Sequence, residues 1–404
     1  MRLENKLALA GDWALISRKA ADVTHPHHPV FFNLEAAVLS DALHTLGEKS
    51  KKAGPSIANF QLPSIPQLAV VALANNHIMD FGVAGLTHSI QEIKKRGWAY
   101  AGAGNNKYAA KNSVDFDWCD KKVALISRCE TQFGVATETK AGVAAIDSSV
   151  YEQIRALKEE ADIVIVSIHA AAEMVPWPSP KRQDTWRSLI DAGADVIHGH
   201  HAHVPQGWEE YNGGLIFYGL GNFCVDPDKW SWHPQGLWSL TPELLIEEKR
   251  ITMEPKTSVI EDQGESVLVR EASEAEHKTH LLYLDQCNQP LSDRALLEGL
   301  WQEASVRLYE DYFSQWLKFD STSILKNMFR QARKKVGEVK KRLRGEVSTN
   351  SNPSRADLLL WYHLFVCESH SDAISTALGV LGGELEDLRS DKTAHLVNEL
   401  MVLR

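Results

Sequence analysis

The sequence predicts an α/β fold that is followed by a mostly α-helical C-terminal region. Short apolar runs alternate with helical patterns over the first half of the chain, which is typical of an α/β sheet. These runs contain few polar residues, as expected for strands that are covered on both faces. From residue 292 onward, apolar residues recur at helical spacing. We therefore expect a first domain at residues 1–258, a connecting segment at 259–290 and a helical region at 291–404.

The predicted strands of the first domain are short and buried, and several end at a polar residue of metal-ligand or acid–base type. In chain order they cover residues 7–10, 30–34, 68–73, 123–127, 162–168, 195–197 and 215–218. The helical patterns between them include residues 85–96, 148–160 and 181–192. Because ligands of open α/β sheets bind at the carboxyl ends of the strands, we expect a binding site there.

The chain changes character after residue 258. Residues 261–278 are polar and predict a loop, whereas residues 280–284 (HLLYL) suggest one last strand. Residues 345–354 predict a linker, followed by two or three helices with a break at Gly382–Gly383.

Charge and cysteine content exclude several classes of protein. The 404 residues include 43 Lys and Arg against 53 Asp and Glu, a net charge of -10, so we expect no specific nucleic-acid partner. The five cysteines are odd in number and form no CxxC motif, which argues against a disulfide framework and favours a cytoplasmic setting. The apolar run Leu7–Ala10 is too short for a signal peptide, and no run reaches the roughly 18 apolar residues of a transmembrane helix.

A basic stretch at residues 330–344 has apolar residues between its Lys and Arg residues. Two interpretations stay open. The stretch is either a solvated helix face in an acidic chain, or a peripheral contact with an anionic membrane surface or an acidic polymer. The sequence also leaves the oligomeric state open.

Clustered histidines after the strand at 195–197 are the strongest chemical signal. His198, His200, His201 and His203 fall within six residues. A lone histidine is more often structural, but a cluster that follows a buried strand favours metal ligation. His201 and His203 are separated by one residue, so a loop can direct both rings at neighbouring metal positions.

Further candidate ligands follow other predicted strands. Asp12 and Glu35 supply carboxylates, Asn76 supplies an amide oxygen and His169 supplies another imidazole. Each is a weak signal alone, since strand-end carboxylates often cap helices. Together, oxygen and nitrogen donors without thiolates favour Mn²⁺, Fe²⁺ or Zn²⁺, with a carboxylate bridging two ions about 3.5–4 Å apart.

The sequence Asn75-Asn76-His77-Ile78-Met79-Asp80 adds acid–base chemistry. Asp80 lies three residues after His77, so its carboxylate can fix the tautomer of the imidazole. The alternative is a turn with an asparagine cap.

The ordered motifs resemble one family. GD, NLE, NNHxxD, Hx3E, LIDAGADVIxGHHxHVPQG and YNGGLIFYGLGNF are similar to motifs of the CapA/PgsA capsule (poly-γ-glutamate) synthesis family, which resembles the calcineurin-like metallophosphoesterase superfamily. The resemblance covers residues 7–225 and is most specific over 189–223. It implies a metallophosphoesterase α/β sandwich in the first domain.

The resemblance implies two divalent ions (Mn, Fe or Zn), or a single one. The implied metal ligands all offer oxygen or nitrogen donors and are Asp12, Glu35, Asn76, His169, His201 and His203. Among these, Glu35 would bridge the two ions. Asp12 and His203 would hold the first ion.

The resemblance also implies catalytic and substrate-binding roles. His77 would be a general acid or an oxyanion stabiliser, oriented by Asp80. The substrate would contact Glu173, Asn222 and His200.

Four positions depart from the pattern of the family. Ala14 stands where the wider superfamily often has a histidine, which removes a ligand of the first ion. Ala170–Ala171 replaces a Trp-Gly pair and Met174 replaces a tyrosine, which alters the pocket near Glu173.

These features predict a metal-dependent hydrolase of the phosphoesterase type, in which a metal-activated water attacks a phosphate ester. The expected substrate is a small molecule or polymer that carries phosphate or carboxylate. Two alternatives stay open. One is a non-catalytic accessory factor that binds a charged ligand during polymer or exopolysaccharide assembly, and the other is a metal-dependent amide hydrolase.

Overall fold

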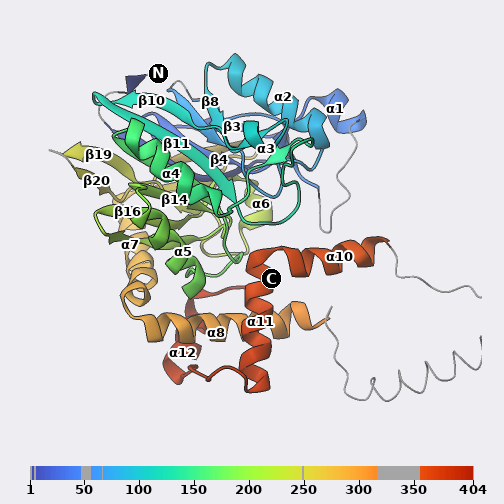
Figure 1. Ribbon diagram of the computed structural model, residues 1–404, viewed down its shortest axis with the longest axis vertical. Helices are drawn as coiled ribbons and strands as arrows, with labels where there is room; N and C mark the ends of the chain where they lie inside the picture. The colour runs from blue at the N-terminus through green and yellow to red at the C-terminus, as the bar shows by residue number, and fades with distance from the viewer. Residues whose placement is uncertain are drawn as a thin grey trace, which may run out of the picture.

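The computed structural model describes residues 2–3, 6–46, 56–65, 67–247, 250–315 and 355–403. Two β-sheets form the body of the N-terminal part (Figure 1). The first sheet has the strand order β1 (Arg2–Leu3), β10 (Val114–Trp118), β11 (Lys121–Cys129), β13 (Ile163–His169), β14 (Val196–His200), β16 (Gly214–Leu220) and β15 (Pro205–Tyr211). The central strands β11, β13, β14 and β16 are parallel to one another.

The second sheet has the strand order β20 (Arg250–Glu254), β19 (Glu243–Glu247), β2 (Leu7–Ala14), β4 (Val30–Leu34), β7 (Ala69–Ala72) and β8 (Ala99–Ala101), with β17 (Asn222–Val225) also paired to β2. Strands β2, β4, β7 and β8 are parallel. The predicted strand at 7–10 is therefore longer than expected, since β2 continues through Asp12.

The two sheets pack face to face and helices cover their outer faces. Leu9 and Phe31 of the second sheet share one buried cluster with Ile165 of the first. On the outer faces, α2 (Gly82–Lys95) packs on the second sheet, and α4 (Ser149–Glu160) and α5 (Pro180–Asp191) pack on the first. Strands buried on both faces explain the continuous apolar runs. The α/β sandwich predicted for this part of the chain is confirmed.

Short elements connect the main ones. They are β5 (Ala37–Val38), α1 (Asp41–Leu46), β6 (Ala58–Asn59), β9 (Ala103–Gly104), α3 (Lys107–Ala110), β12 (Gly142–Val143) and α6 (Pro227–Trp230).

The segment at 259–290 is more regular than predicted. Strand β21 (Thr257–Asp262) crosses the expected boundary at 258 and pairs with β22 (Ser266–Glu271), and both join a small sheet with β18 (Trp238–Leu240) and β3 (Ala20–Val23). The loop predicted at 261–278 is therefore wrong, because this hairpin buries only one face and keeps polar residues on the other. The strand predicted at 280–284 is also wrong, because these residues lie in α7 (Glu274–Asn288).

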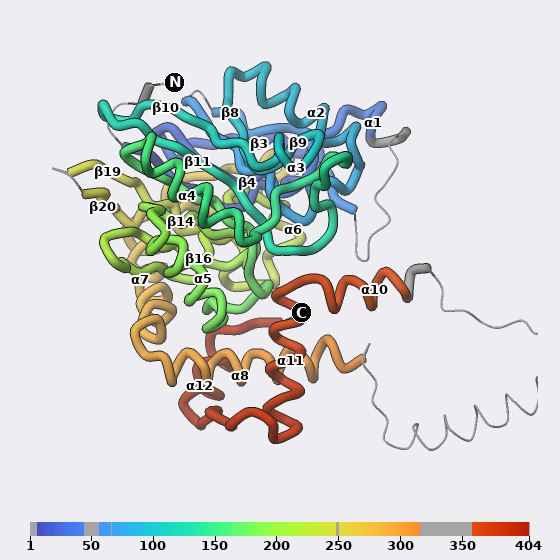
Figure 2. Tube along the Cα trace, viewed as in Figure 1, coloured from blue at the N-terminus to red at the C-terminus, as the bar shows by residue number. Residues whose placement is uncertain are grey.

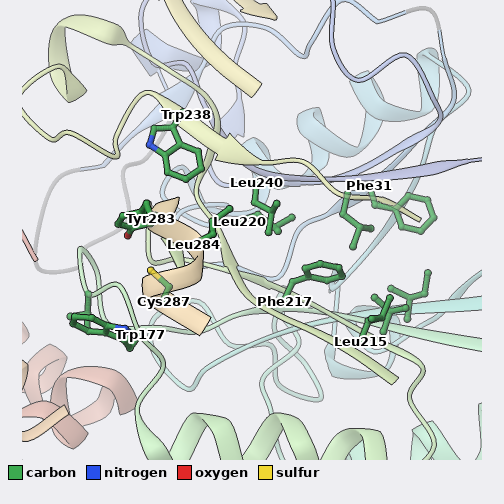
Figure 3. Packing of buried hydrophobic residues seen from close by; sticks show 14 of the residues in the cluster. Phe31, Trp177, Leu215, Phe217, Leu220, Trp238, Leu240, Tyr283, Leu284 and Cys287 are labelled. Carbon is green, nitrogen blue, oxygen red and sulfur yellow. The ribbon is translucent and has the colours of Figure 1, made fainter. Parts of the chain in front are cut away.

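Helix α7 links the sandwich to the helical C-terminal region. Its residues Tyr283, Leu284 and Cys287 face the sandwich, close to Trp238 and Leu220 (Figure 3). The rings of Tyr283 and Trp238 meet edge to face, with centroids 5.5 Å apart. Since these residues share one buried cluster with the sheets and with α8 (Arg294–Asp311), the two parts of the chain have a continuous core.

The C-terminal helices form a compact group beside the sandwich (Figure 2). Helix α8 packs against α11 (Glu368–Gly382) and α12 (Asp391–Leu400), and α10 (Arg355–Val366) leads into α11. The 3-10 helices η1 (Gln289–Ser292) and η2 (Phe313–Gln315) flank α8. The predicted break at Gly382–Gly383 is confirmed, because Gly383 ends α11 in the left-handed conformation with φ of 76°.

Two predictions about membranes have different outcomes. Each helix within the described ranges is too short or too polar to cross a bilayer. The basic stretch at 330–344 and the predicted linker at 345–354 lie outside the described residues, so contact of this stretch with a membrane surface stays a prediction.

Candidate metal centre

The carboxyl ends of strands from both sheets supply the predicted ligands. Asp12 lies in β2, Glu35 directly follows β4, and Asn76 lies in the loop after β7. His169 is the last residue of β13, and His201 follows the last residue of β14. These strand ends meet at one buried place.

Glu35, His201 and His203 form the tightest group. One donor atom of each lies within 4.8 Å of the others, and all three residues are buried. Nε2 of His203 is 3.3 Å from Oε1 of Glu35. Oε2 of Glu35 and Nδ1 of His201 have no hydrogen-bond partner among the residues that the structure describes. Since buried polar atoms are normally paired, these two atoms fit ligands of a cation.

Asp12 lies among three histidines. Its carboxylate oxygens are 3.4 Å from Nδ1 of His200, 3.7 Å from Nδ1 of His203 and 3.8 Å from Nδ1 of His169. Burial alone would raise the pKa of Asp12, but the hydrogen bond and charge of His200 and the charges of the other two rings hold it well below its usual value. Asp12 is therefore an ionised carboxylate, the form that binds a metal.

His169 and Asn76 are adjacent, as expected for ligands of one ion. Nε2 of His169 is 3.0 Å from Oδ1 of Asn76 and 3.8 Å from Oε1 of Glu35. The ring of His169 lies beside that of His201, with centroids 4.4 Å apart. His169 thus lies between Asn76 and the carboxylate that is predicted to bridge two ions.

The loop after β14 holds its histidines in an uncommon backbone conformation. His201 has φ of 91° and His203 has φ of 59°, values that residues other than glycine rarely adopt. The backbone N–H of His201 donates to Oδ2 of Asp12 at 3.2 Å. Oδ1 of Asn222 lies 3.0 Å from Nδ1 of His203, so this ring directs Nε2 at Glu35. Strain of this kind is concentrated at functional sites.

Glycine is required where β2 passes the end of β16. A Cβ atom on Gly11 would lie 1.8 Å from the carbonyl oxygen of Gly221. Gly221 itself has φ of 82°, and its carbonyl accepts a hydrogen bond from the N–H of Asp12 at 3.1 Å. This close approach sets the position of Asp12.

His77 and Asp80 are paired as predicted. Nδ1 of His77 lies 2.7 Å from Oδ2 of Asp80, which also accepts the N–H of Ile57 at 2.9 Å. The His77 side chain is 15% exposed and that of Asp80 is 1% exposed. The side chain of Asn75 accepts the backbone N–H groups of His77 and Ile78, at 3.1 and 2.8 Å, and so shapes the loop.

The residues predicted to contact substrate occupy different places. Glu173 is exposed in the loop after β13 and interacts electrostatically with His203. Asn222 is fully buried and holds His203, and His200 is 1% exposed beside Asp12. Both residues are thus buried beside the predicted ligands, and their contact with a substrate stays a prediction.

The structure adds Glu130, which the sequence did not single out. Glu130 follows β11, is fully buried, and has Oε1 3.3 Å from Nε2 of His201. Arg182 of α5 pairs with its Oε2 at 2.5 Å. Ser369, in the first turn of α11, donates its backbone N–H and its hydroxyl to Oε2 at 2.9 and 2.6 Å. One carboxylate thus joins a predicted metal ligand to the C-terminal helices.

Two asparagines were also missed as parts of the site. Asn33 donates from Nδ2 to Oδ1 of Asp12 at 2.7 Å, and the same atom lies 3.2 Å from Nδ1 of His169. Asn75 donates to Oδ1 of Asn33 at 3.0 Å. Both residues belong to the NLE and NNH motifs, so the signal was present, but each stands next to a residue with more obvious metal chemistry.

Opposite charges balance within the centre. Burial alone would lower the pKa of His203, but the carboxylates of Glu35 and Asp12 raise it to about 10. Burial alone would raise the pKa of Glu130, but the hydrogen bond of His201 and the charge of Arg182 lower it to about 2. Protons on imidazoles thus offset buried carboxylates, which is the charge that a bound cation would supply in their place.

The chain resembles known proteins over its N-terminal half. Residues 4–227 match the family model described as bacterial capsule synthesis protein PGA_cap. The chain is 36% identical over 164 residues to the capsule biosynthesis protein CapA of Bacillus anthracis, a match that covers 39% of this chain and 40% of that protein. It is 35% identical over 165 residues to the PGA biosynthesis protein CapA of Bacillus subtilis (strain 168), covering 39% and 42%.

A probable polyglutamine synthesis accessory protein of Mycobacterium tuberculosis is 30% identical over 252 residues, which cover 56% of this chain and 63% of that protein. The chain therefore covers less than two thirds of the length of each of these relatives. The family match spans more than half of the chain, and it includes all the strand ends described above. The chain thus belongs to the bacterial capsule synthesis protein PGA_cap family, a member of the metallophosphoesterase-like superfamily.

Proposed function

We propose that this protein is a metal-dependent hydrolase of phosphate esters that serves capsule, poly-γ-glutamate or exopolysaccharide synthesis. The convergence of Glu35, His201 and His203, with donor atoms within 4.8 Å of one another, carries the proposal. The names of the relatives, which concern capsule and PGA biosynthesis, support the biological setting. The cysteines of the chain are all free thiols, which supports a cytoplasmic location.

The residues that would hold divalent ions are Asp12, Glu35, Asn76, His169, His201 and His203. All six donors are oxygen or nitrogen, which suits Mn²⁺, Fe²⁺ or Zn²⁺. When bound, such ions neutralise a phosphate and make a water molecule nucleophilic at neutral pH. Ala14 offers no donor, so the position beside Asp12 and His203 has fewer protein ligands and a single-ion site stays an alternative.

His77 would act as the general acid. Asp80 holds Nδ1 of His77 at 2.7 Å, so a proton passed to the leaving oxygen of the ester would come from Nε2. Asn222 and Glu130 would orient His203 and His201 in the same way, through their contacts at 3.0 and 3.3 Å. Glu173, exposed near His203, is the residue that we place at the substrate entrance.

Hydrolysis of p-nitrophenyl phosphate and bis-p-nitrophenyl phosphate by the tag-free protein with Mn²⁺, Fe²⁺ or Zn²⁺ tests the proposal. We expect turnover that falls by a factor of about 10² to 10⁴ in His77→Gln. The control is His395→Gln, because His395 is exposed on α12 and does not belong to the candidate metal centre. Equal rates for the wild type and His77→Gln would refute the role of His77, and inert protein under all three metals would refute the hydrolase.

A second candidate function is a non-catalytic accessory factor that binds a charged ligand. The accessory role in the name of the mycobacterial relative and the missing ligand at Ala14 favour it. It predicts tight binding of a phosphate or polyglutamate ligand without turnover. Cleavage of poly-γ-glutamate with no cleavage of phosphate esters would instead favour a metal-dependent amide hydrolase. Partners other than such ligands, including a membrane surface for residues 330–344, stay predictions.

A further inference from the structure

A second group of metal-type donors lies in another part of the chain. One donor atom from each of His25, His27 and Glu271 lies within 4.8 Å of the other two. The two histidines belong to the loop between β3 and β4, and Glu271 is the last residue of β22. The candidate metal centre uses none of these three residues.

The backbone, and not a chance side-chain contact, brings this group together. Strands β3 and β22 are parallel neighbours, with Val23 opposite Val269. The N–H of Thr24 continues the pairing by donating to the carbonyl of Val269 at 2.8 Å. Two residues farther along both strands, the same register places His25 beside Glu271.

His25 has the features of a ligand that lacks its partner. Its side chain is buried, with the residue 1% exposed, and neither ring nitrogen has a hydrogen-bond partner among the described residues. Buried polar atoms without partners are rare in folded proteins.

The other two donors can reach the same point from solvent. The ring of His27 is exposed and lies 5.9 Å from that of His25, centroid to centroid, at 87°. Oε1 of Glu271 is 3.4 Å from Nζ of Lys256, with both side chains more than a third exposed. An exposed ion pair of this kind contributes little free energy, so Lys256 does not prevent Glu271 from turning to a cation.

We propose that His25, His27 and Glu271 form a zinc site, separate from the candidate metal centre, with a fourth position open to solvent. Two imidazoles and one carboxylate are a donor set that Zn²⁺ takes. The exposed donors provide an entry path for the ion, and the buried ring of His25 fixes one ligand in place. A bound ion would fasten the loop after β3 to the end of β22.

Zinc binding to the full-length, tag-free Glu35→Ala protein tests this site without the candidate metal centre. Equilibrium dialysis followed by elemental analysis should find about one zinc ion per chain. His27→Ala and Glu271→Gln, both at exposed positions that do not threaten the fold, should each lower the affinity at least about tenfold. His28→Ala is the matched control, because His28 is adjacent in sequence and its Nε2 lies near Glu243 instead, at 3.6 Å.

Two further readouts separate this site from the proposed hydrolase centre. Co²⁺ in place of Zn²⁺ should give visible absorption bands that His27→Ala removes and His28→Ala retains. When each substitution is made alone in the wild-type protein, His27→Ala and Glu35→Ala should remove different ions. The proposal is overturned if His27→Ala and Glu271→Gln, each added to Glu35→Ala, change neither the zinc content nor the affinity for zinc. This outcome does not depend on whether Glu35→Ala itself removes an ion from the wild type.

Discussion

At the scale of single residues, His77 and Asp80 form the most self-contained unit of the site. The Asp80 carboxylate is buried. Its Oδ2 accepts a hydrogen bond from the backbone N–H of Ile57 and lies 2.7 Å from Nδ1 of His77. The imidazole therefore has a fixed tautomer and orientation before any ligand arrives. The three-residue spacing in the sequence was enough to predict this pair, because both residues lie in one short loop.

Asp80→Asn should lower kcat about 10- to 100-fold and leave the metal content unchanged. The amide still accepts the N–H of Ile57, but it no longer offers a carboxylate oxygen to Nδ1 of His77. The assay is phosphate-ester hydrolysis at saturating substrate, with the metal content of each sample measured beside it. A loss of metal in this variant would contradict the role of Asp80, which is to orient His77 and not to support the metal ligands.

His203 predicts a pH dependence of stability in chelator-treated protein. Its pKa is raised from 6.5 in the unfolded chain to about 10 in the fold. The stability that it contributes is thus fully present below pH 6.5 and is lost as the pH rises through about 10. Urea unfolding at pH 7 and pH 10 should show a decrease of a few kcal/mol that His203→Gln largely removes. A flat profile in the wild type would contradict this account.

At the scale of elements, the close approach of β2 to the chain after β16 positions Asp12. Gly11→Ala should destabilise the protein by at least about 3 kcal/mol, because the new Cβ meets the carbonyl of Gly221 at 1.8 Å. Gly382→Ala is the control, since a Cβ there meets nothing within 4 Å. It should change stability by no more than about 1 kcal/mol. Urea unfolding of both variants measures the difference, and a well-tolerated Gly11→Ala would contradict the described packing.

Helix α11 reaches the candidate metal centre through Glu130. Glu130→Gln should destabilise the protein by up to about 3–5 kcal/mol, because the buried charge of Arg182 loses its nearer carboxylate partner and keeps only Glu368. It should also weaken metal binding about 10- to 100-fold, because Nε2 of His201 loses its acceptor. Glu368→Gln is the matched control, since Glu368 also pairs with Arg182, at 3.1 Å. Isothermal titration with Mn²⁺ should show unchanged affinity in that control.

The same carboxylate predicts acid sensitivity. The pKa of Glu130 is lowered from 4.5 to about 2, so its contribution to stability is present above pH 4.5 and is lost as the pH falls toward about 2. Comparison of unfolding at pH 5 and pH 3 should show a smaller decrease in Glu130→Gln than in the wild type. Equal decreases would mean that Glu130 is not ionised in the fold.

At the scale of the whole molecule, local patterns predicted the sandwich and most of the site. Strands buried on both faces give continuous apolar runs, and strand ends place ligands in one region, so Asp12, Glu35 and His169 could be chosen from the sequence. Glu130 could not be chosen, because its partners Arg182 and Ser369 are 52 and 239 residues away. Contacts at that separation leave no local signal.

The connecting segment was mispredicted for a related reason. The hairpin β21–β22 buries one face only, so its sequence is as polar as a loop until its partner strand β3 is known. The pairing of β22 with β3 also creates the zinc site that we propose at His25, His27 and Glu271. In both cases the contact that matters is the pairing of β22 with β3, two strands that lie far apart in the sequence.

We propose that Glu35, His201 and His203 hold a catalytic metal ion. The most direct test is the metal content of gently purified, tag-free protein by elemental analysis, with wild type, Glu35→Ala and His27→Ala side by side. We expect Glu35→Ala to lose one or two ions that His27→Ala retains, whereas the zinc ion proposed at His27 should be lost in His27→Ala and retained in Glu35→Ala. A metal content that is the same in wild type and Glu35→Ala, or no metal at this site after loading with Mn²⁺, Fe²⁺ or Zn²⁺, would contradict this proposal.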